Sequence, residues 1–434
     1  MNKYYIETYG CQMNEADSEI VCGILENQGL TRTDLLEEAD LILLNTCSVR
    51  EKPEQKIYSR LGKINKILSK GKNPKIGVIG CMAQNLKGEI FKKNSNVNFV
   101  LGPDSYRKLP EIIKTHKKHV IYTDLSKTEV YEELFPSRNS GMNAWITIMR
   151  GCDKFCTYCI VPFTRGRERS KSIEGVLKEI ENSANKGFIE ITLLGQNVNS
   201  YNYKGKNFTD LLNEIVKNKK IKRIRYVSPH PQDVTEELLK LHRDHYPKLA
   251  NHIHLPLQSG SDNVLKAMNR NYTQKHYLSL VKKIREYVPN MSITTDMIVG
   301  FPGETKEDFK ETLRVMKEVK FDTSFMFKYS PRPYSRAYKM KDDVNEEEKS
   351  KRLSEMIELQ KEHTLFRNEE YVGKEAEIIV EGFSKKSQSE MMGRTSSNKI
   401  VIFPVIDNFG EIIEKKTIIR KTIISTKGVT LFAK

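Results

Sequence analysis

Strand-like and helix-like segments alternate along most of this 434-residue chain, and this alternation limits its fold more than any other feature. Between residues 141 and 370, six apolar segments have the length and composition of buried strands, and helical patterns follow most of them. The six strand candidates are AWITIMRG (144–151), FIEITLLGQ (188–196), IKRIRYVSP (221–229), NHIHLPLQ (251–258), SITTDMIVG (292–300) and TSFMFKYSP (323–331). Six βα units in a row predict a parallel barrel or part-barrel of the TIM type, closed by a charged helix over 345–370.

The two flanking regions differ from this centre. Residues 1–118 contain four further strand candidates with helices between them, which predicts a separate α/β domain with a parallel sheet. These strands are YYIETYG (4–10), ADLILLNTC (39–47), PKIGVIGC (74–81) and VNFVLG (97–102). Residues 119–140 show no period and contain Pro, Ser and Gly, as linkers do. Residues 371–434 are rich in β-branched residues and predict a small all-β barrel; a purely structural β appendix is the alternative.

The charge balance favours a polyanionic partner. Lys and Arg number 72 against 56 Asp and Glu, giving a net charge of +16, and the all-β region alone has 11 basic and 7 acidic residues. Such a field is typical of nucleic-acid binding, although a lysine-rich proteome would produce the same total. No apolar run approaches the roughly 18 residues of a membrane span, and the N-terminus has no signal-peptide pattern. We therefore expect a cytoplasmic protein without a membrane partner.

Three of the seven cysteines lie within eight residues, in the stretch RGCDKFCTYC. Cys152, Cys156 and Cys159 have the spacing C-x3-C-x2-C and follow the first barrel strand, at the edge where TIM-type barrels place active sites. Three thiolates can hold three irons of a 4Fe–4S cubane, which leaves the fourth iron open to bind a substrate. Structural zinc is the weaker alternative because it needs four ligands, and no further Cys or His lies nearby.

A second set of three cysteines is dispersed in sequence. Cys11, Cys47 and Cys81 each end one of the first three strand candidates, 36 and 34 residues apart. Parallel strands bring their carboxyl ends to one edge of a sheet, so these thiols should converge and hold a second three-cysteine cluster. The alternative is three ordinary core cysteines, which is what we expect of Cys22, in the middle of a helical pattern.

These motifs resemble a known family. The C-x3-C-x2-C loop is similar to that of the radical S-adenosylmethionine (SAM) superfamily, and the whole chain resembles the methylthiotransferases of that superfamily, in particular the enzymes that act on isopentenylated tRNA. The resemblance rests on TYGCQMNEADSE (8–19), NTCSVREKPEQK (45–56), GCMAQ (80–84), GCDKFCTYCIVPFTRGRERS (151–170), LLGQNVNSY (193–201) and HLPLQSGSDNVLKAMNRNYT (254–273). It implies an N-terminal methylthiotransferase domain (1–118), a linker (119–140), a radical SAM core (141–370) and a TRAM RNA-binding domain (371–434).

The resemblance also implies a reaction. The enzyme would replace the C2 hydrogen of N6-isopentenyladenosine, next to the anticodon on its 3′ side, with a methylthio group. One SAM would donate a methyl group to sulfur held at an auxiliary 4Fe–4S cluster on Cys11, Cys47 and Cys81. A second SAM would form a radical at the cluster on Cys152, Cys156 and Cys159. Partners would be the tRNA, a reductant such as flavodoxin or ferredoxin and a sulfur donor system, and we expect the chain to be a monomer.

Further contact residues follow from the same resemblance and from positions at barrel-strand ends. For SAM we expect Tyr158, Gly195, Gln196, Ser228, Gln258, Ser259 and Ile298. For tRNA phosphate we expect Arg165, Arg167, Arg394, Lys399, Lys415, Lys416, Arg420 and Lys421.

Three other functions remain open at this stage. One is a related methylthiotransferase that acts on threonylcarbamoyl-adenosine in tRNA or on a ribosomal protein. The second is a non-catalytic iron–sulfur protein that binds RNA, in which SAM would neither be cleaved nor perturb the reduced cluster. The third is a zinc-stabilised RNA-binding module, which would be colourless and free of labile sulfide.

Overall fold

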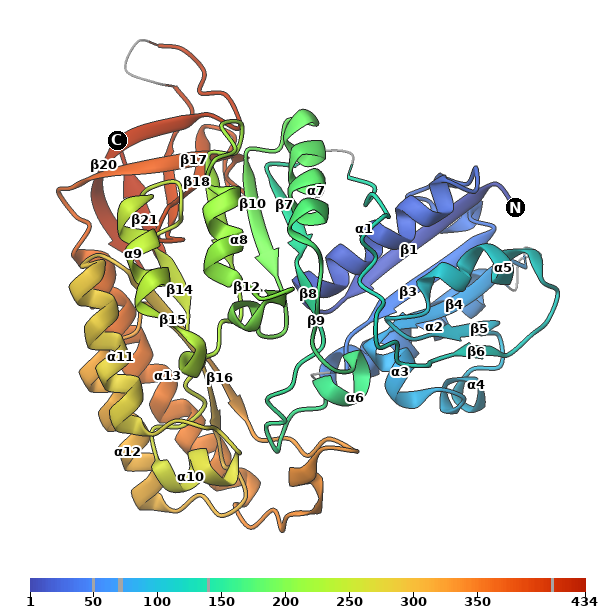
Figure 1. The fold of residues 1–434 in the computed structure, drawn as a ribbon, viewed down its shortest axis with the longest axis horizontal. Coiled ribbons are helices and arrows are strands. Elements are labelled where there is room, and N and C mark those ends of the chain that lie inside the picture. Colours follow the sequence, from blue (N-terminus) through green and yellow to red (C-terminus); the bar gives the residue numbers. More distant parts are fainter. Residues whose placement is uncertain (49–50, 69–72, 139–140, 407–409) are drawn as a thin grey trace.

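The computed structural model, which describes residues 1–48, 51–68, 73–138, 141–406 and 410–434, consists of a sheet domain, a part-barrel and a closed β-barrel in chain order (Figure 1). The first domain contains a six-stranded sheet in the order β2-β1-β3-β4-β5-β6, and all neighbouring pairs are parallel. Its strands are β1 (Lys3–Tyr9), β2 (Thr31–Arg32), β3 (Leu41–Thr46), β4 (Lys75–Gly80), β5 (Phe99–Leu101) and β6 (Val120–Tyr122).

The order of these strands reverses between β1 and β3. The chain passes from β1 outward to β2 and then crosses to β3 on the other side, so β1 and β3 form the switch point of the sheet. At such a point the two crossover connections diverge and leave a crevice beyond the carboxyl ends of the strands, where ligands of open α/β sheets bind.

Helices cover both faces of this sheet. In β3, Leu41 and Leu43 face α1 (Gln12–Glu26) and α5 (Leu109–Lys114), whereas Ile42 and Leu44 face α2 (Glu51–Leu68), α3 (Cys81–Leu86) and α4 (Glu89–Lys93). Strand side chains alternate between the two faces, and a parallel sheet covered on both sides needs apolar residues on each. This explains why LILL is an unbroken apolar run.

Part of the segment expected to be a linker belongs to this first domain. Residues 120–122 form the edge strand β6, and Tyr131 is fully buried in the core between the sheet and α1. The apolar run VIY is short and lies between the polar stretches HKKH and TDLSK, so the sequence pattern does not predict a strand there.

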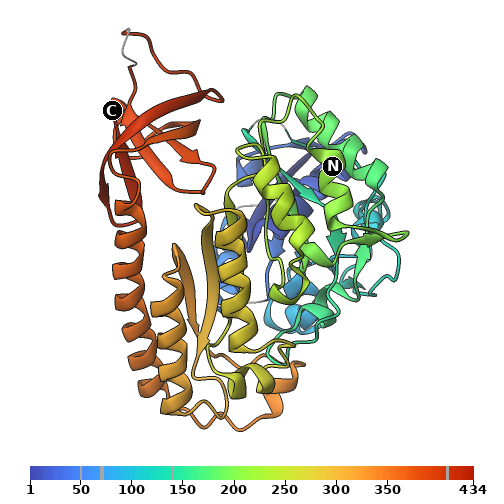
Figure 2. The same cartoon turned by 60° about the vertical axis from the view of Figure 1, so that its left-hand side comes forward.

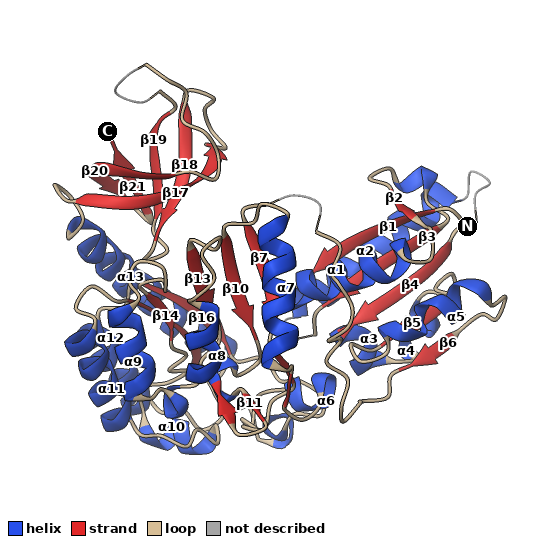
Figure 3. Cartoon of the chain, turned by 45° about the horizontal axis from the view of Figure 1, so that its top comes forward, coloured by secondary structure: helices blue, strands red, loops and turns tan. Residues whose placement is uncertain are grey.

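The central domain has the six parallel strands that the sequence predicts. The order is β7-β10-β13 followed by β14-β15-β16, and a parallel bridge between Ile224 and Leu249 joins the two sets into one curved sheet (Figure 3). The strands are β7 (Asn143–Thr147), β10 (Glu190–Leu194), β13 (Arg223–Tyr226), β14 (His252–His254), β15 (Ser292–Val299) and β16 (Thr323–Lys328). The helices outside it are α7 (Ile173–Asn185), α8 (Phe208–Ile215), α9 (Glu236–Asp244), α10 (Asp262–Ala267), α11 (Gln274–Tyr287) and α12 (Lys306–Val319).

A long helix leads from the part-barrel to the C-terminal domain. This helix, α13 (Glu346–Glu369), runs along the side of β16 and ends at the closed barrel (Figure 2). The barrel order is β17-β18-β19-β21-β20, with β17 (Glu375–Phe383), β18 (Glu390–Thr395), β19 (Ile400–Pro404), β20 (Ile418–Lys427) and β21 (Thr430–Ala433). Strand β18, EMMGRT, has no β-branched run and was not expected from the sequence.

Buried arginines fasten this barrel to the central domain. Arg223 Nη1 donates to the carbonyl of Arg394 at 2.8 Å, and Arg225 Nη2 donates to the carbonyl of Thr395 at 2.8 Å. Lys399 is also buried at this junction, where its ammonium lies 2.7 Å from a carboxylate oxygen of Asp322. The closed barrel therefore packs at a defined position against the amino-terminal ends of the central strands. Within the described ranges, no helix has both the length and the apolar character needed to span a bilayer.

Candidate active site

The C-x3-C-x2-C loop lies beyond β7, between β8 (Met149–Arg150) and α6 (Val161–Arg165), at the carboxyl end of the barrel strands. The chain enters the loop through Gly151, whose φ is +81°. A Cβ at this position would lie 1.9 Å from the carbonyl oxygen of Arg167, so only glycine allows this close approach of backbone to backbone. All three cysteines of the loop are partly exposed and none forms a disulfide.

The environment of this loop disfavours bare thiolates. Burial raises the pKa of Cys152 and of Cys159 to about 12. A thiol with such a pKa stays protonated at neutral pH unless a cation compensates, and iron does this when it binds. Three cysteines with this chemistry therefore fit the three protein ligands of an open cubane.

Arg270 is a site residue that the sequence did not reveal. Its Nη1 lies 3.6 Å from the Sγ of Cys156, while its other nitrogens donate to the hydroxyl of Tyr272 at 2.9 Å and to the carbonyl of Pro256 at 2.8 Å. Its side chain is buried, and its charge faces the cysteine loop from 114 residues further along the chain. The stretch NRNY has no feature that separates this arginine from a surface arginine.

The residues expected to contact SAM have different surroundings in the structure. Gln196 Oε1 accepts from the Gly151 amide at 2.6 Å, and its buried Nε2 has no hydrogen-bond partner among the described residues. Tyr158 and Ile298 pack against the same small apolar cluster as Phe301. Gly195 and Ser228 follow the ends of β10 and β13, and Gln258 forms an isolated parallel bridge with Met297. Ser228 and Gln258 have positive φ values of +60° and +72°.

Ser259 does not match this expectation. Its hydroxyl lies 3.3 Å from that of Thr312 on α12, and the residue as a whole is 1% exposed. The serine therefore joins a loop to a helix rather than facing the site.

The second set of cysteines lies at the carboxyl edge of the N-terminal sheet. In the strand register Tyr9 is opposite Thr46 and Thr46 is opposite Gly80, so Cys11, Cys47 and Cys81 follow three adjacent strand ends. Cys47 and Cys81 are buried, and Cys11 is exposed at the start of α1. This edge includes the switch point between β1 and β3, as a ligand site would require.

Two of these thiols differ in acidity. A hydrogen bond from Cys47, aided by the positive charge of Arg165, lowers the pKa of Cys11 to about 6. Burial raises the pKa of Cys81, and attraction to Arg165 opposes that rise. Arg165 was expected to contact tRNA phosphate, but its side chain is buried against these cysteines and lies 2.8 Å from Asp17.

The surroundings of the N-terminal cysteines carry excess positive charge. Asp17 binds two buried guanidinium groups, those of Arg150 and Arg165, and the buried pair of Asp104 and Arg169 is neutral. The Nη1 of Arg150 and the Nη1 of Arg165 are both buried and have no described hydrogen-bond partner. A buried cation without a full set of acceptors is costly, so this pocket favours an anionic occupant such as a thiolate-bound cluster.

No three His, Cys, Asp or Glu side chains in the described ranges are grouped as ligands of a single metal ion. In a cubane each thiolate binds a different iron, so its cysteines need not meet around one atom.

The remaining tRNA candidates are placed unevenly. Arg167 is exposed but paired with Asp153 at 2.6 Å. In the closed barrel Lys415, Lys416 and Arg420 are exposed, and Arg394 is partly exposed and paired with Glu381. Lys399 and Lys421 are buried, so neither is available to phosphate in this structure.

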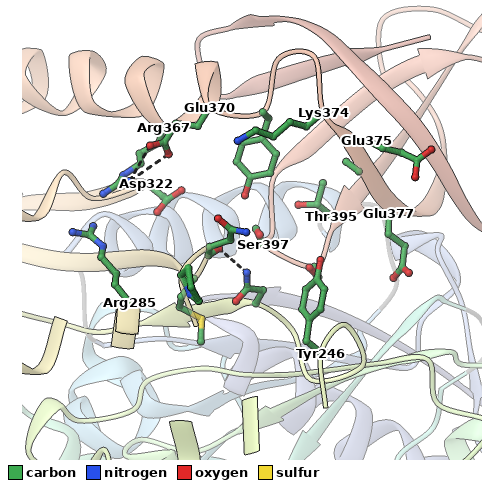
Figure 4. Close-up of a pocket in the computed structure, with 17 residues that line it drawn as sticks. Tyr246, Arg285, Asp322, Arg367, Glu370, Lys374, Glu375, Glu377, Thr395 and Ser397 are labelled. Carbon is green, nitrogen blue, oxygen red and sulfur yellow. Dashed lines mark hydrogen bonds and ion pairs between the residues drawn. The ribbon is translucent and has the colours of Figure 1, made fainter. Parts of the chain in front are cut away.

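A cavity of about 270 Å³ lies at the opposite end of the central strands, where they meet the closed barrel (Figure 4). Arg285, Asp322 and Arg367 lie on one side of it, with Glu375 and Glu377 on the other. The amino-terminal face of a TIM-type barrel contributes to stability rather than catalysis, and this mixed-charge cavity is remote from both cysteine sets.

Comparison with known families assigns all three parts of the chain. A profile described as the radical SAM superfamily matches residues 146–316, one described as uncharacterized protein family UPF0004 matches 3–102, and one for the TRAM domain matches 369–414. A tRNA-2-methylthio-N(6)-dimethylallyladenosine synthase of Azobacteroides pseudotrichonymphae is 48% identical, with 93% of this chain and 91% of the relative aligned. The protein of the same name from Porphyromonas gingivalis (strain W83) is 46% identical over 92% of this chain and 89% of its own.

Solved structures agree on the fold. The radical SAM methyltransferase TsrM of Kitasatospora setae aligns over 78% of this chain and 75% of its own, with a TM-score of 0.58 and 14% identity. The cobalamin-dependent radical SAM enzyme OxsB aligns over 83% of this chain and 56% of its own, with a TM-score of 0.55 and 15% identity.

Proposed function

This chain belongs to the tRNA-2-methylthio-N6-dimethylallyladenosine synthase family, and on that premise we propose how its residues divide the reaction. It is a radical SAM tRNA methylthiotransferase that adds a methylthio group to C2 of N6-isopentenyladenosine beside the anticodon. One 4Fe–4S cluster and SAM are its cofactors. The C2–H bond is unactivated, so the bound cofactors supply the one-electron chemistry while the protein orients the reactants.

Cys152, Cys156 and Cys159 would hold the cluster that binds SAM, with Arg270 donating to the thiolate of Cys156. Gln196 would orient SAM through its free Nε2, since its Oε1 is already committed to Gly151. Tyr158 and Ile298 would supply an apolar surface beside the adenine.

Cys11, Cys47 and Cys81 would hold a second cluster that presents sulfur. The observation that carries this assignment is that one short helix connects the two sets of cysteines. Helix α6 begins two residues after Cys159 and ends at Arg165. The positive charge of Arg165 opposes a rise in the pKa of Cys81 and helps to lower the pKa of Cys11. At 1.5 Å per helical residue, the backbone between Cys159 and Arg165 spans only about 9 Å. The two clusters would thus be held at neighbouring positions, one at the edge of each sheet.

Several partners complete the proposal. A one-electron reductant such as flavodoxin or ferredoxin and a sulfur donor system would serve the two clusters. We place the reaction in the cytoplasm and treat the chain as a monomer.

The test compares wild type with two triple Cys→Ala variants, one at residues 152, 156 and 159 and one at residues 11, 47 and 81. Anaerobic iron should be about eight atoms in wild type and about four in each variant, and mass spectrometry of tRNA nucleosides should detect the methylthio product with wild type but with neither triple variant. Cys22→Ala removes a buried cysteine outside both sets and is the matched control. About four irons falling to none in the 152/156/159 variant would refute the second cluster. A product found only on a ribosomal protein would refute the substrate.

A further inference from the structure

A basic and aromatic loop stands beside the cysteine loop, and neither the family comparison nor the proposed mechanism assigns it a role. Residues 331–341, PRPYSRAYKMK, follow β16 and contain the short helix η5 (Arg336–Lys339). The Ala337 amide donates to the carbonyl of Thr157, between Cys156 and Cys159, at 2.8 Å. Ala337 is also buried in the apolar cluster that includes Tyr158. The loop thus lies at the mouth of the site, at the same end of the barrel as α6 (Figure 1).

The outer side of this loop is aromatic and cationic. Tyr334 and Tyr338 are 65% and 53% exposed, whereas large aromatic side chains are mostly buried in folded proteins. The loop has four basic residues and no acidic residue: Arg332, Arg336, Lys339 and Lys341. No hydrogen bond or ion pair joins the side chain of any of these four to another described residue.

The acidic residues that follow the loop do not neutralise it. Asp342 lies 2.7 Å from the ammonium of Lys349, and Asp343 accepts from the Gly303 amide at 2.8 Å. Both carboxylates therefore interact with residues outside the loop, and the loop cations remain available to an external anion.

The backbone at Tyr334 is strained. Its φ is +72°, in the left-handed region that a bulky residue rarely adopts. Such strain persists where the surrounding structure imposes it, and it is concentrated at functional positions. Here the strained residue carries an aromatic ring that lies largely in solvent.

We propose that residues 331–341 bind the unpaired nucleotides of the tRNA anticodon loop, with bases stacked on Tyr334 and Tyr338 and phosphates paired with the four cations. The inference rests on the proposed function, because the modified adenosine must reach the cysteine loop that this segment borders. Unpaired bases stack on aromatic rings without regard to sequence, and interleaved cations follow the backbone. An acidic protein partner would use the cations, but it has no unpaired bases to stack on the aromatic rings.

The first test measures the affinity of the full-length holoenzyme for an anticodon stem-loop RNA that carries isopentenyladenosine. Tyr334→Ala and Tyr338→Ala should each weaken binding by about 5- to 150-fold, the range for loss of one base stack, whereas Tyr334→Phe and Tyr338→Phe should bind as wild type. Tyr334→Gly separates binding from folding: it relieves the strained φ, so the thermal midpoint should not fall although binding does. Unchanged affinity of the alanine variants would overturn the proposal.

The second test uses salt dependence. Changing the four loop cations to Gln should lower the slope of log affinity against log salt by roughly 3, at about 0.7 for each contact with a single strand. The control changes four exposed lysines on the outer helices, Lys240, Lys275, Lys282 and Lys310, to Gln. If both quadruple variants lower the salt slope equally, the loop cations act only through the overall positive charge of the protein, and the proposal is overturned. If wild type forms no methylthio product on any tRNA, the proposed function fails; if wild type forms it and the loop variants bind RNA normally, this inference alone fails.

Discussion

Arg165 Nη2 lies 2.8 Å from Asp17 Oδ2, and this buried ion pair joins the central domain to the N-terminal sheet domain. Arg150 uses the other carboxylate oxygen of Asp17. Because one carboxylate serves two guanidinium groups, the boundary keeps a positive charge on the side of Cys11 and Cys81. The cysteine edge is therefore prepared for an anion by residues of both domains.

Arg165→Met should weaken the auxiliary cluster. Asp17 keeps Arg150 as a partner, so the fold should survive, but the site loses the charge that favours thiolates and an anionic cluster. We expect iron content to fall toward about four atoms, or the reduction potential of the remaining auxiliary cluster to become more negative. Anaerobic iron analysis and EPR-monitored redox titration measure these. Arg167→Gln, an exposed change two residues away, is the control. Wild-type iron and potential in Arg165→Met would contradict the role.

Arg270→Met should affect the other cluster. It removes the donor 3.6 Å from Cys156 and a buried positive charge, so the reduced cluster becomes harder to form. We expect a more negative reduction potential and slower SAM cleavage under dithionite, with Arg270→Lys restoring part of the potential because it keeps the charge. An unchanged reduction potential of the cluster in Arg270→Met, measured by EPR, would show that this arginine only positions Tyr272.

Arg225→Met should loosen the C-terminal barrel. The change removes hydrogen bonds to two carbonyls of the β18–β19 turn and the guanidinium that lies 3.2 Å from the buried Glu190. Breaking a buried pair on one side costs about 3–5 kcal/mol. We expect a lower urea midpoint and faster proteolysis near residues 371–374. Lys222→Gln, an exposed change on the same approach to β13, should leave both unchanged. A wild-type midpoint in Arg225→Met would show that the barrel is held by other contacts.

Two buried histidines should make the fold sensitive to acid. Burial lowers the pKa of His242 to about 4 and that of His230 to about 2, from 6.5 in the unfolded chain. A depressed folded pKa means that the unfolded chain binds the proton first, so stability is full above pH 6.5 and falls as pH drops toward the folded values. For each histidine the loss approaches about 1.4 kcal/mol per pH unit.

Urea unfolding between pH 7.5 and 5 measures this loss. His242→Gln should reduce the slope of stability against pH, whereas His276→Gln, at an exposed position of α11, should not. A slope unaltered by His242→Gln would contradict the assignment.

The sequence by itself determined four of the six strands of the N-terminal sheet, the six strands of the central part-barrel and the positions of six cysteines along the chain. Both are local properties: period and apolar runs define strands, and a cysteine directly after a strand lies at the sheet edge wherever that sheet packs. The motifs also identified the family. Strands β2, β6 and β18 were missed because two or three residues between polar neighbours, or a Met- and Gly-containing segment, carry little local signal.

Only the tertiary structure decided which charged side chains face the site and which face solvent. Arg165, Lys399 and Lys421 have the sequence pattern of surface cations, yet all three are buried. Arg270 reaches Cys156 across 114 residues of chain, and Tyr334 is exposed beside that same loop. Burial and pairing depend on which elements pack together over such distances, and the energy of a charge depends on that environment more than on its neighbours in sequence.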